Sequence, residues 1–247
     1  MPYTVMNISP RRLLFFLREY FFPCGCALCG VQLAGINEAW YGLCEECRKG
    51  LETEKQEHCN VCGKPLVSEQ VCCLACRNNE ERSCDKMKVF FPYTGKYRRL
   101  LTAYKFGKNI ALGNFFTEKI LKSLAEDNRL TQTAIVPVPP RPGKIKEKGW
   151  DQIEFLAKLL KREVKSVPGG IKIHRCLKRL RSGAQKELGR NERMENLKNR
   201  IVLEGTAPKY ALLIDDIITT GATMDICASV LKSNGVEKVY GLCLFYD

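Results

Sequence analysis

The most informative segment of this chain is Ala211-Leu212-Leu213-Ile214-Asp215-Asp216-Ile217-Ile218-Thr219-Thr220-Gly221-Ala222-Thr223. Its first part is a continuous apolar run, which is typical of a strand buried on both faces of a parallel sheet. An acidic pair follows directly, and a short loop rich in hydroxyl groups leads into a predicted helix over 224–233. We therefore expect polar side chains to gather where this strand ends.

The loop after the strand has the composition of a phosphate-binding site. Backbone N–H groups at the amino end of a helix attract anions, and a glycine lets the anion approach closely. Thr219, Thr220 and Thr223 would add hydroxyl donors. The carboxylates of Asp215 and Asp216 suit the two hydroxyls of a ribose, or a Mg²⁺ ion bound to them. The alternative interpretation is an exposed strand end and a threonine-capped helix that bind no ligand.

The segments around this stretch alternate between strand and helix patterns. Strands are predicted at 88–91, 134–138, 210–214 and 239–245, and helices at 97–106, 110–124, after the capping residue Asp151, and at 224–233. Such alternation predicts an α/β fold, a parallel sheet flanked by helices with ligands at the carboxyl ends of the strands. We place this domain at residues 85–247.

Cysteine is concentrated in the preceding part of the chain, where 11 of the 14 cysteines lie between residues 24 and 84. The pattern Cys-x-x-Cys-Gly occurs twice, from Cys26 and from Cys59, and each copy is followed by a second Cys-x-x-Cys pair. Eight paired thiolates are enough for two tetrahedral zinc sites. The candidate ligands are Cys26, Cys29, Cys44, Cys47, Cys59, Cys62, Cys73 and Cys76. We therefore predict an amino-terminal domain over 1–84, consisting of a helix and a double zinc ribbon.

Several features of these ribbons are left open by the sequence. Zinc is favoured over disulfides because the cytoplasm keeps thiols reduced. Consecutive or cross-braced pairs would both give four ligands per ion, and consecutive pairing is favoured because each repeat is then self-contained. Cys72 stands beside Cys73 and could replace it as a ligand. A closed four-thiolate site has no open position, so both ions are expected to be structural.

Positive charge is concentrated in residues 141–200, which hold 18 of the 40 Lys+Arg but only 7 of the 27 Asp+Glu. A block of this kind is typical of a contact for nucleotide or nucleic-acid phosphates, or of a solvated face. Near the amino terminus, Arg18 interrupts an apolar run that is far shorter than the ~20 residues needed to span a bilayer. No transmembrane segment is predicted, and a cytoplasmic location is expected. Residues 13–22 suit either a membrane-surface helix or a helix packed against the ribbons.

All thirteen positions of 211–223 fit the PRPP-binding signature of type I phosphoribosyltransferases, which this segment closely resembles. Over nearly its whole length the chain is similar to the ComF (ComFC-type) competence family. The matching residues are Phe22-Pro23, Lys105-Phe106-Gly107, Val136 to Pro142, Lys148 to Gln152, Gln185, Leu188, Arg190, Glu192, Arg193 and Asn196. The family usually has Asn where this chain has Asp151, Phe at Trp150 and Ser at Gly189.

The resemblance implies a role for each matching residue. Asp215 and Asp216 would hold the ribose. The 5′-phosphate would be bound by Thr219, Thr220, Gly221, Ala222 and Thr223. Pro139, Pro140 and Arg141 would lie in a turn that binds pyrophosphate, with Lys105 facing the same site, and the catalytic candidates are Asp215, Asp216, Arg141 and Lys105. A mobile flap would include Gln185, Arg190, Arg193 and Asn196.

Two classes of function follow from this resemblance. In the first, the protein binds PRPP with Mg²⁺ and acts in the uptake of single-stranded DNA during natural transformation, with a competence helicase or DNA-processing protein as a further partner. In the second, it is an active phosphoribosyltransferase that transfers phosphoribose to an acceptor in nucleotide metabolism. The residues do not identify that acceptor, and the sequence leaves open whether turnover occurs.

Overall fold

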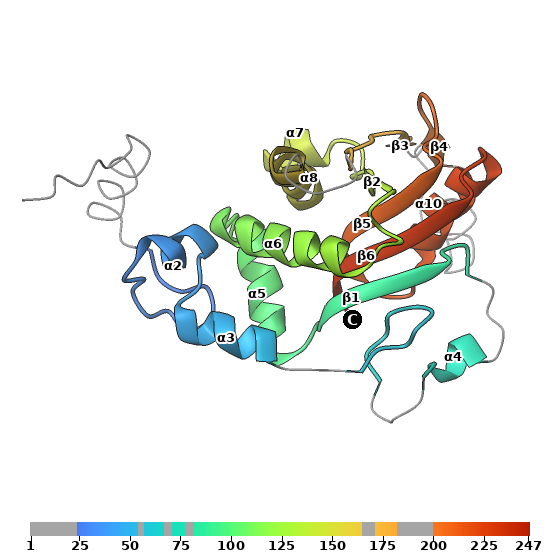
Figure 1. Cartoon of the computed structure of the whole chain (residues 1–247). Helices are drawn as coiled ribbons and strands as arrows, with labels where there is room; N and C mark the ends of the chain where they lie inside the picture. Colours follow the sequence, from blue (N-terminus) through green and yellow to red (C-terminus); the bar gives the residue numbers. More distant parts are fainter. Residues whose placement is uncertain (1–23, 54–56, 67–70, 78–81, 165–170, 182–199) are drawn as a thin grey trace, which may run out of the picture.

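The computed structural model describes residues 24–53, 57–66, 71–77, 82–164, 171–181 and 200–247. Its centre is a four-stranded parallel sheet with the strand order β1-β6-β5-β2 (Figure 1). The strands are β1 (Lys86–Pro92), β2 (Ala134–Pro137), β5 (Tyr210–Ile218) and β6 (Lys238–Tyr246). The α/β fold with a parallel sheet, predicted from the sequence, is therefore confirmed.

Helices cover both faces of the sheet. One face carries α5 (Gly95–Lys105), α6 (Ala111–Glu126) and α8 (Gln152–Glu163), with the short α7 (Lys144–Lys148) before α8. The other face carries α10 (Ala222–Ser233) and the antiparallel pair β3 (Leu177–Arg179) and β4 (Ile201–Leu203). Alternate residues of β5 pack into the cores on the two faces, because successive side chains of a strand point in opposite directions. Leu212 and Ile214 join the first core, and Ala211 and Leu213 join the second.

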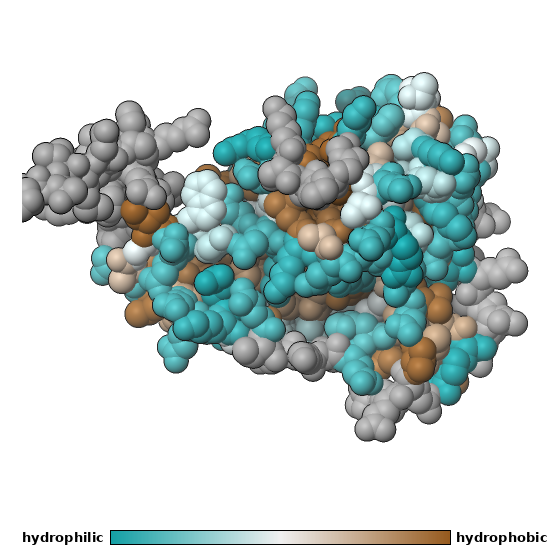
Figure 2. All heavy atoms as spheres, in the orientation of Figure 1, coloured by the Kyte–Doolittle hydropathy of each residue, from teal (hydrophilic) through white to brown (hydrophobic). Residues whose placement is uncertain are grey.

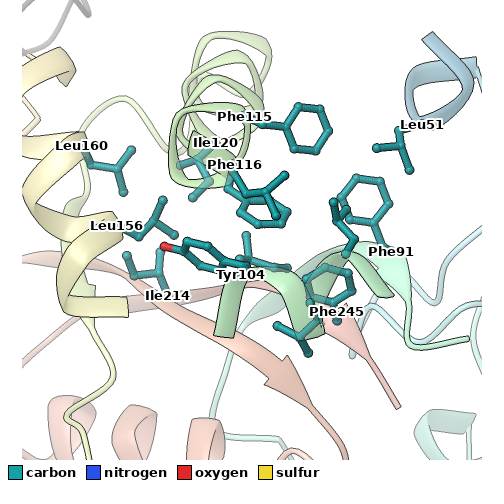
Figure 3. Packing of buried hydrophobic residues seen from close by; sticks show 14 of the residues in the cluster. Leu51, Phe91, Tyr104, Phe115, Phe116, Ile120, Leu156, Leu160, Ile214 and Phe245 are labelled. Atoms are coloured by element: carbon teal, nitrogen blue, oxygen red, sulfur yellow. The ribbon is translucent and has the colours of Figure 1, made fainter. Parts of the chain in front are cut away.

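The first core is rich in aromatic rings. Tyr104 and Phe116 lie with their ring centroids 5.0 Å apart, and Phe116 meets Phe245 edge-on at 5.8 Å. Figure 3 shows these rings packed between α5, α6 and the sheet, with Leu51 reaching the same cluster. The outer surface in the view of Figure 2 is mainly hydrophilic. This packing fixes the carboxyl end of α5 beside the carboxyl end of β5.

The two cysteine-rich ribbons are attached to the α/β part in different ways. The first contains α2 (Ile36–Tyr41) and α3 (Glu45–Thr53), and its Leu28, Leu43 and Leu51 belong to the first core. The second contains α4 (Leu74–Arg77) and has a small cluster of its own. It lies beside β1 in Figure 1, and the backbone N–H of Met87 donates to the carbonyl of Val61 at 3.0 Å. The second ribbon therefore covers part of an edge strand that would otherwise present unpaired backbone groups.

Most predicted elements lie within a few residues of the observed ones, and one difference affects the candidate site. The strand predicted at 210–214 continues to Ile218, because Ile217 and Ile218 pair with Phe245 and Tyr246 of β6. The acidic pair is thus inside β5 and not in the loop after it. Among the described residues, no helix is both long and apolar enough to cross a bilayer. Residues 13–22 lie outside the described residues.

Candidate phosphate-binding site and metal centres

The acidic pair lies near the carboxyl end of β5, where its two side chains face opposite sides of the sheet. Asp216 has the same parity as Leu212 and Ile214 and is only 5% exposed. Its Oδ2 lies 2.5 Å from Lys105 Nζ at the end of α5, and accepts a hydrogen bond from Gln152 Nε2 at 2.6 Å. Of the two aspartates, Asp216 is therefore the one that forms an ion pair with Lys105.

Asp215 lies on the α10 side of the sheet. Burial, and then the negative charge of Asp216, raise the pKa of Asp215 well above its usual range. Its Oδ1 accepts a hydrogen bond from the backbone N–H of Asp216 at 2.8 Å. The two adjacent carboxyls therefore have different environments, and Asp215 keeps its proton to a higher pH than an exposed aspartate does.

A chain of polar contacts extends from Asp216 across α8. Gln152 donates to Asp216 and accepts a hydrogen bond from Lys144 Nζ at 2.7 Å. Its backbone carbonyl accepts a hydrogen bond from the hydroxyl of Tyr104 at 2.7 Å. Gln152 is thereby held by three elements, so its amide is fixed toward Asp216.

Asp151 stands where the resemblance described above leads us to expect Asn. Its Oδ1 accepts hydrogen bonds from the backbone N–H groups of Ile153 and Glu154, both at 3.0 Å, which caps α8 as predicted. Its Oδ2 forms an ion pair with Lys144. The additional negative charge is therefore balanced within the site. Sequence reasoning missed Lys144, and the signal that could have found it was the unbalanced charge at Asp151.

The loop after β5 turns into α10 at Gly221, which has a φ of 84°. Thr219 and Thr220 are exposed, whereas Gly221 is buried. Arg82 lies against this loop, with Nη1 3.0 Å from the carbonyl of Thr220 and 2.7 Å from Asp225 Oδ2. Sequence reasoning missed Arg82, because it stands outside every motif and 138 residues before Thr220.

The proline-rich turn after β2 is tied to β5 by one hydrogen bond, from the N–H of Val138 to the carbonyl of Ile214 at 3.0 Å. Arg141 in this turn is exposed, and its Nη2 lies 2.6 Å from Glu147 Oε2. It lines a cavity of about 430 Å³ together with Pro139 and Pro140. Asp215, Asp216 and Lys105 are not among the described residues that line this cavity. The structure thus brings Lys105 and Asp216 together but places Arg141 at a separate cavity.

A larger cavity, of about 850 Å³, lies toward the amino ends of the strands, between β1, α6 and the second ribbon. Its lining includes Lys86, Lys119 and Leu212. Of the candidate site residues, Cys59 of the second ribbon is the one that lines this cavity in the described part of the chain. Its size alone does not connect it with the polar groups at the carboxyl ends of β2 and β5, where the motif residues lie.

The eight predicted ligand cysteines form two groups, and in each group the four Sγ atoms lie within 4.8 Å of one another. Consecutive pairing is confirmed, since one group is Cys26, Cys29, Cys44 and Cys47 and the other is Cys59, Cys62, Cys73 and Cys76. Cys73 belongs to the second group and Cys72 does not. Four thiols at this separation suit a tetrahedral ion, so the groups are consistent with two structural zinc ions.

The backbone around the two groups follows the sequence repeat. The N–H of Gly30 donates to Cys26 O, and that of Gly63 donates to Cys59 O, both at 2.9 Å. Both glycines have a positive φ, 78° at Gly30 and 71° at Gly63. Burial acts to raise the pKa of the Cys59 thiol. Hydrogen bonds from backbone N–H groups, including that of Cys62, outweigh this effect and lower the pKa to about 6. Such donors stabilise a thiolate, which is the form that binds metal.

Both parts of the chain are similar to known proteins. A model of the double zinc ribbon domain matches residues 17–77. The chain is 26% identical to Competence protein F of Haemophilus influenzae over 228 residues, which are 89% of this chain and 95% of that protein. It is 27% identical to Competence protein ComFC of Streptococcus pneumoniae over 202 residues, 80% of this chain and 84% of that protein. The resemblance to the ComF family is confirmed. DNA utilization protein YhgH of Escherichia coli is 25% identical over 224 residues, 89% of this chain and 95% of that protein.

These relatives match the ribbons and the α/β part together, because the aligned share of this chain is longer than either part alone. The division into domains at residue 84 stays a prediction, and in the structure the first ribbon shares a core with the sheet. The flap expected from the ComF resemblance lies outside the described residues. Its predicted members are Gln185, Arg190, Arg193 and Asn196.

Proposed function

We propose that this protein binds PRPP with Mg²⁺ and acts in the uptake of single-stranded DNA during natural transformation. Its relatives are named competence proteins and DNA utilization proteins, which supports a role in handling incoming DNA. The observation that carries the ligand is the polar cluster at the end of β5, where Lys105 and Gln152 hold Asp216 beside a glycine-containing loop at the start of α10.

In the proposed complex the ligand lies along the end of β5. The side chains of Asp215 and Asp216, one on each side of the end of β5, bind the ribose hydroxyls, and backbone N–H groups of 221–223 hold the 5′-phosphate. Carboxylate oxygens are the ligands that Mg²⁺ prefers, so Asp216 would hold it, and the ion would neutralise charge on the diphosphate. Lys105 adds a cation close to the reacting end of the sugar.

The proposed DNA contact is the cavity beside the turn after β2. The two acidic residues that line this cavity are paired, Glu154 with Arg175 at 2.8 Å and Glu204 with Lys178 at 2.6 Å. Arg141, which also lines it, pairs with Glu147 at 2.6 Å. Lys146, Arg179 and Arg181 also line the cavity, and within the described part of the chain they form no ion pair. Cations without an acidic partner in a concave surface suit the phosphodiester backbone.

The PRPP proposal is tested by calorimetry with PRPP and Mg²⁺. Wild type should bind, and Asp215→Asn/Asp216→Asn should bind at least about tenfold more weakly, because charge-assisted hydrogen bonds to the ribose are lost. Asp127→Asn is the control, since Asp127 pairs with Arg129 on the surface and should leave binding unchanged. Thermal unfolding shows whether each variant is folded. A wild-type protein that takes up no PRPP contradicts the proposal.

The second candidate function, transfer of phosphoribose, is favoured by Lys105 beside Asp216, where a cation would stabilise charge that develops on the leaving diphosphate. Release of pyrophosphate in the presence of a panel of nucleobases, lost in Lys105→Ala, would establish it. Binding without release across the panel would establish the binding function alone.

The DNA proposal is tested by the salt dependence of affinity for a single-stranded oligonucleotide. The logarithm of the association constant should fall against the logarithm of salt concentration by about 0.7 for each phosphate contacted. Arg179→Ala/Arg181→Ala removes two cations and should reduce this slope by about 1.4. Arg129→Ala is the control, because Arg129 lies before β2 and is paired with Asp127. A flat salt profile in the wild type is incompatible with the proposal.

A further inference from the structure

The cavity of about 850 Å³ near the amino ends of the strands has a size that suits a small ligand. It lies where α6 and the second ribbon approach β1 (Figure 1). Both ribbons contribute side chains to its lining, among them Arg48 from the first and Asn60 from the second. The cavity is therefore a place where three parts of the chain meet.

Lysines from two elements form much of the cavity wall. Lys119, Lys122 and Ser123 are spaced three or four residues apart on α6 and so share one side of that helix. Lys86 and Lys88 are two residues apart on β1, which places both on one face of the sheet. Positions between a helix and a sheet are usually apolar. Four lysines at this boundary are therefore better suited to an anion than to a closed core.

The acidic residues of the wall do not neutralise these four lysines, which form no ion pair within the described part of the chain. Two of the four carboxylates that line the cavity already pair with an arginine, Glu52 with Arg48 at 3.4 Å and Asp127 with Arg129 at 2.6 Å. The other two belong to Glu118 and Glu126. Even against both of these, the four lysines leave an excess of two positive charges.

Lys119 shows how the wall holds an ammonium group at the cavity. This half-buried side chain places Nζ 5.3 Å from the ring centroid of Phe91 and 5.8 Å from that of Phe115. Burial is the main cause that lowers the pKa of this ammonium, and the charges of Lys122 and Lys88 add to that effect. An anion bound beside Lys119 would counteract both causes.

Ser123 is the second observation that points to a ligand. It lines the cavity, is only 2% exposed, and its Oγ has no hydrogen-bond partner among the described residues. Nearly all buried hydroxyl groups have a partner, because an unpaired one costs free energy. Alanine would avoid that cost and would also favour the helix. The hydroxyl of Ser123 is therefore suited to a hydrogen bond with a bound molecule.

We propose that this cavity binds a small phosphorylated molecule with an aromatic part, the class to which nucleotides belong. The lysines of α6 and β1 hold its phosphate, and Ser123 donates a hydrogen bond to the same group. Leu212, Tyr240 and Leu242, which line the cavity beside the lysines, cover the aromatic part. This site is separate from the end of β5, and the proposal does not depend on PRPP binding.

Calorimetry of the full chain with AMP and UMP tests the site. The wild type should bind at least one of them, and Lys119→Met/Lys122→Met should bind it at least about tenfold more weakly, because charge-assisted hydrogen bonds are lost while the apolar stems remain. Lys158→Met/Lys161→Met is the matched control, since it removes two exposed lysines of α8 outside the cavity and should leave binding unchanged. A wild type that binds neither nucleotide overturns the proposal.

The contribution of the phosphate is tested with two further probes. The nucleoside without its phosphate should bind at least about tenfold more weakly than the nucleotide, and inorganic phosphate should compete with the nucleotide. Equal affinity for the nucleoside and the nucleotide contradicts the proposed role of the lysines.

Ser123→Ala separates a ligand contact from a structural role. The variant should melt at the same temperature as the wild type or higher, because it removes a buried hydroxyl without a partner and favours the helix. It should nevertheless weaken nucleotide binding about fivefold, since one hydrogen bond to the phosphate is lost. Unchanged nucleotide affinity in a folded Ser123→Ala contradicts the proposed site.

Asp215→Asn/Asp216→Asn distinguishes this cavity from the end of β5. Nucleotide binding that persists in the aspartate variant and weakens in Lys119→Met/Lys122→Met supports the cavity, whether or not the wild type takes up PRPP. Nucleotide binding with the reverse pattern belongs to the end of β5 and overturns this proposal. Thermal unfolding shows whether each variant is folded.

Discussion

Asp215 and Asp216 are chemically identical neighbours that the strand separates into two environments. Asp216 meets a lysine and an amide donor on one face of the sheet, whereas Asp215 is half-buried on the α10 side. Because the raised pKa of Asp215 reflects burial and the adjacent charge, the folded protein holds this proton more tightly than the unfolded chain does. The contribution of Asp215 to stability is therefore greatest in acid and is lost as the pH rises through its raised pKa.

Asp215→Asn should consequently raise the free energy of unfolding at about pH 7 and change it little near pH 4, where the carboxyl is protonated in the folded protein. Asn keeps an oxygen that can accept the hydrogen bond from Asp216. Denaturant unfolding from pH 4 to 8 measures the difference. Asp127→Asn should show the opposite sign, because hydrogen bonds from Arg129 lower the pKa of Asp127. An Asp215 variant that is less stable at neutral pH would refute this prediction.

At the scale of the elements, each ribbon contains the same type of turn, but the two turns make different contacts. Gly30 and Gly63 occupy the same position of the repeat and have similar φ values. A Cβ on Gly63 would lie 2.9 Å from Val89 Cγ2 and 3.2 Å from Met87 O, whereas nothing lies within 4 Å of one on Gly30. The turn of the second ribbon is therefore also its contact with β1.

The pair Gly63→Ala and Gly30→Ala separates these two roles. Both carry the cost of a positive φ, about 1 kcal/mol. Gly63→Ala also crowds β1, so it should lose about 1–3 kcal/mol more and accelerate exchange of the Met87 amide. Denaturant unfolding and hydrogen exchange provide the measurements. Equal losses in the two variants would show that the second ribbon does not dock through this turn.

Elements with a strong local pattern were predicted from the sequence. The apolar run at 210–214 and the Cys-x-x-Cys-Gly repeat predict a buried strand and two metal sites, because strand burial and ligand spacing are local properties. The continuation of β5 to Ile218 depends on pairing with β6 and could not be predicted locally. The contacts of Lys144 and Arg82 were missed for the same reason, since their partners are brought close only by the fold.

At the scale of the whole molecule, the first ribbon is part of the main core and the second is not. Leu28, Leu43 and Leu51 pack in the cluster that includes Phe91 and Phe245, whereas the second ribbon clusters around its own cysteines. Loss of metal should therefore have different global effects at the two sites, although the ligand sets are alike.

Cys47→Ser and Cys76→Ser provide the comparison, because each removes the last ligand of its group. The wild type should contain about two zinc ions per chain, and each variant about one. Cys47→Ser should lower the melting temperature by on the order of 10 °C, through loss of support for the shared core, and Cys76→Ser by only a few degrees. Calorimetric melting with metal analysis measures both. Equal shifts would show that the two ribbons are equally integrated.

The position of β6 has a consequence for biosynthesis. This strand, residues 238–246, lies between β1 and β5. Before it is synthesised, β1 and β5 have no strand between them to which both can hydrogen-bond. A nascent polypeptide that ends before residue 238 lacks the middle of its sheet, even with both ribbons already metallated. Completion of the α/β part must therefore wait until nearly all of these residues have left the ribosome, and its long-range pairings make that late step slow.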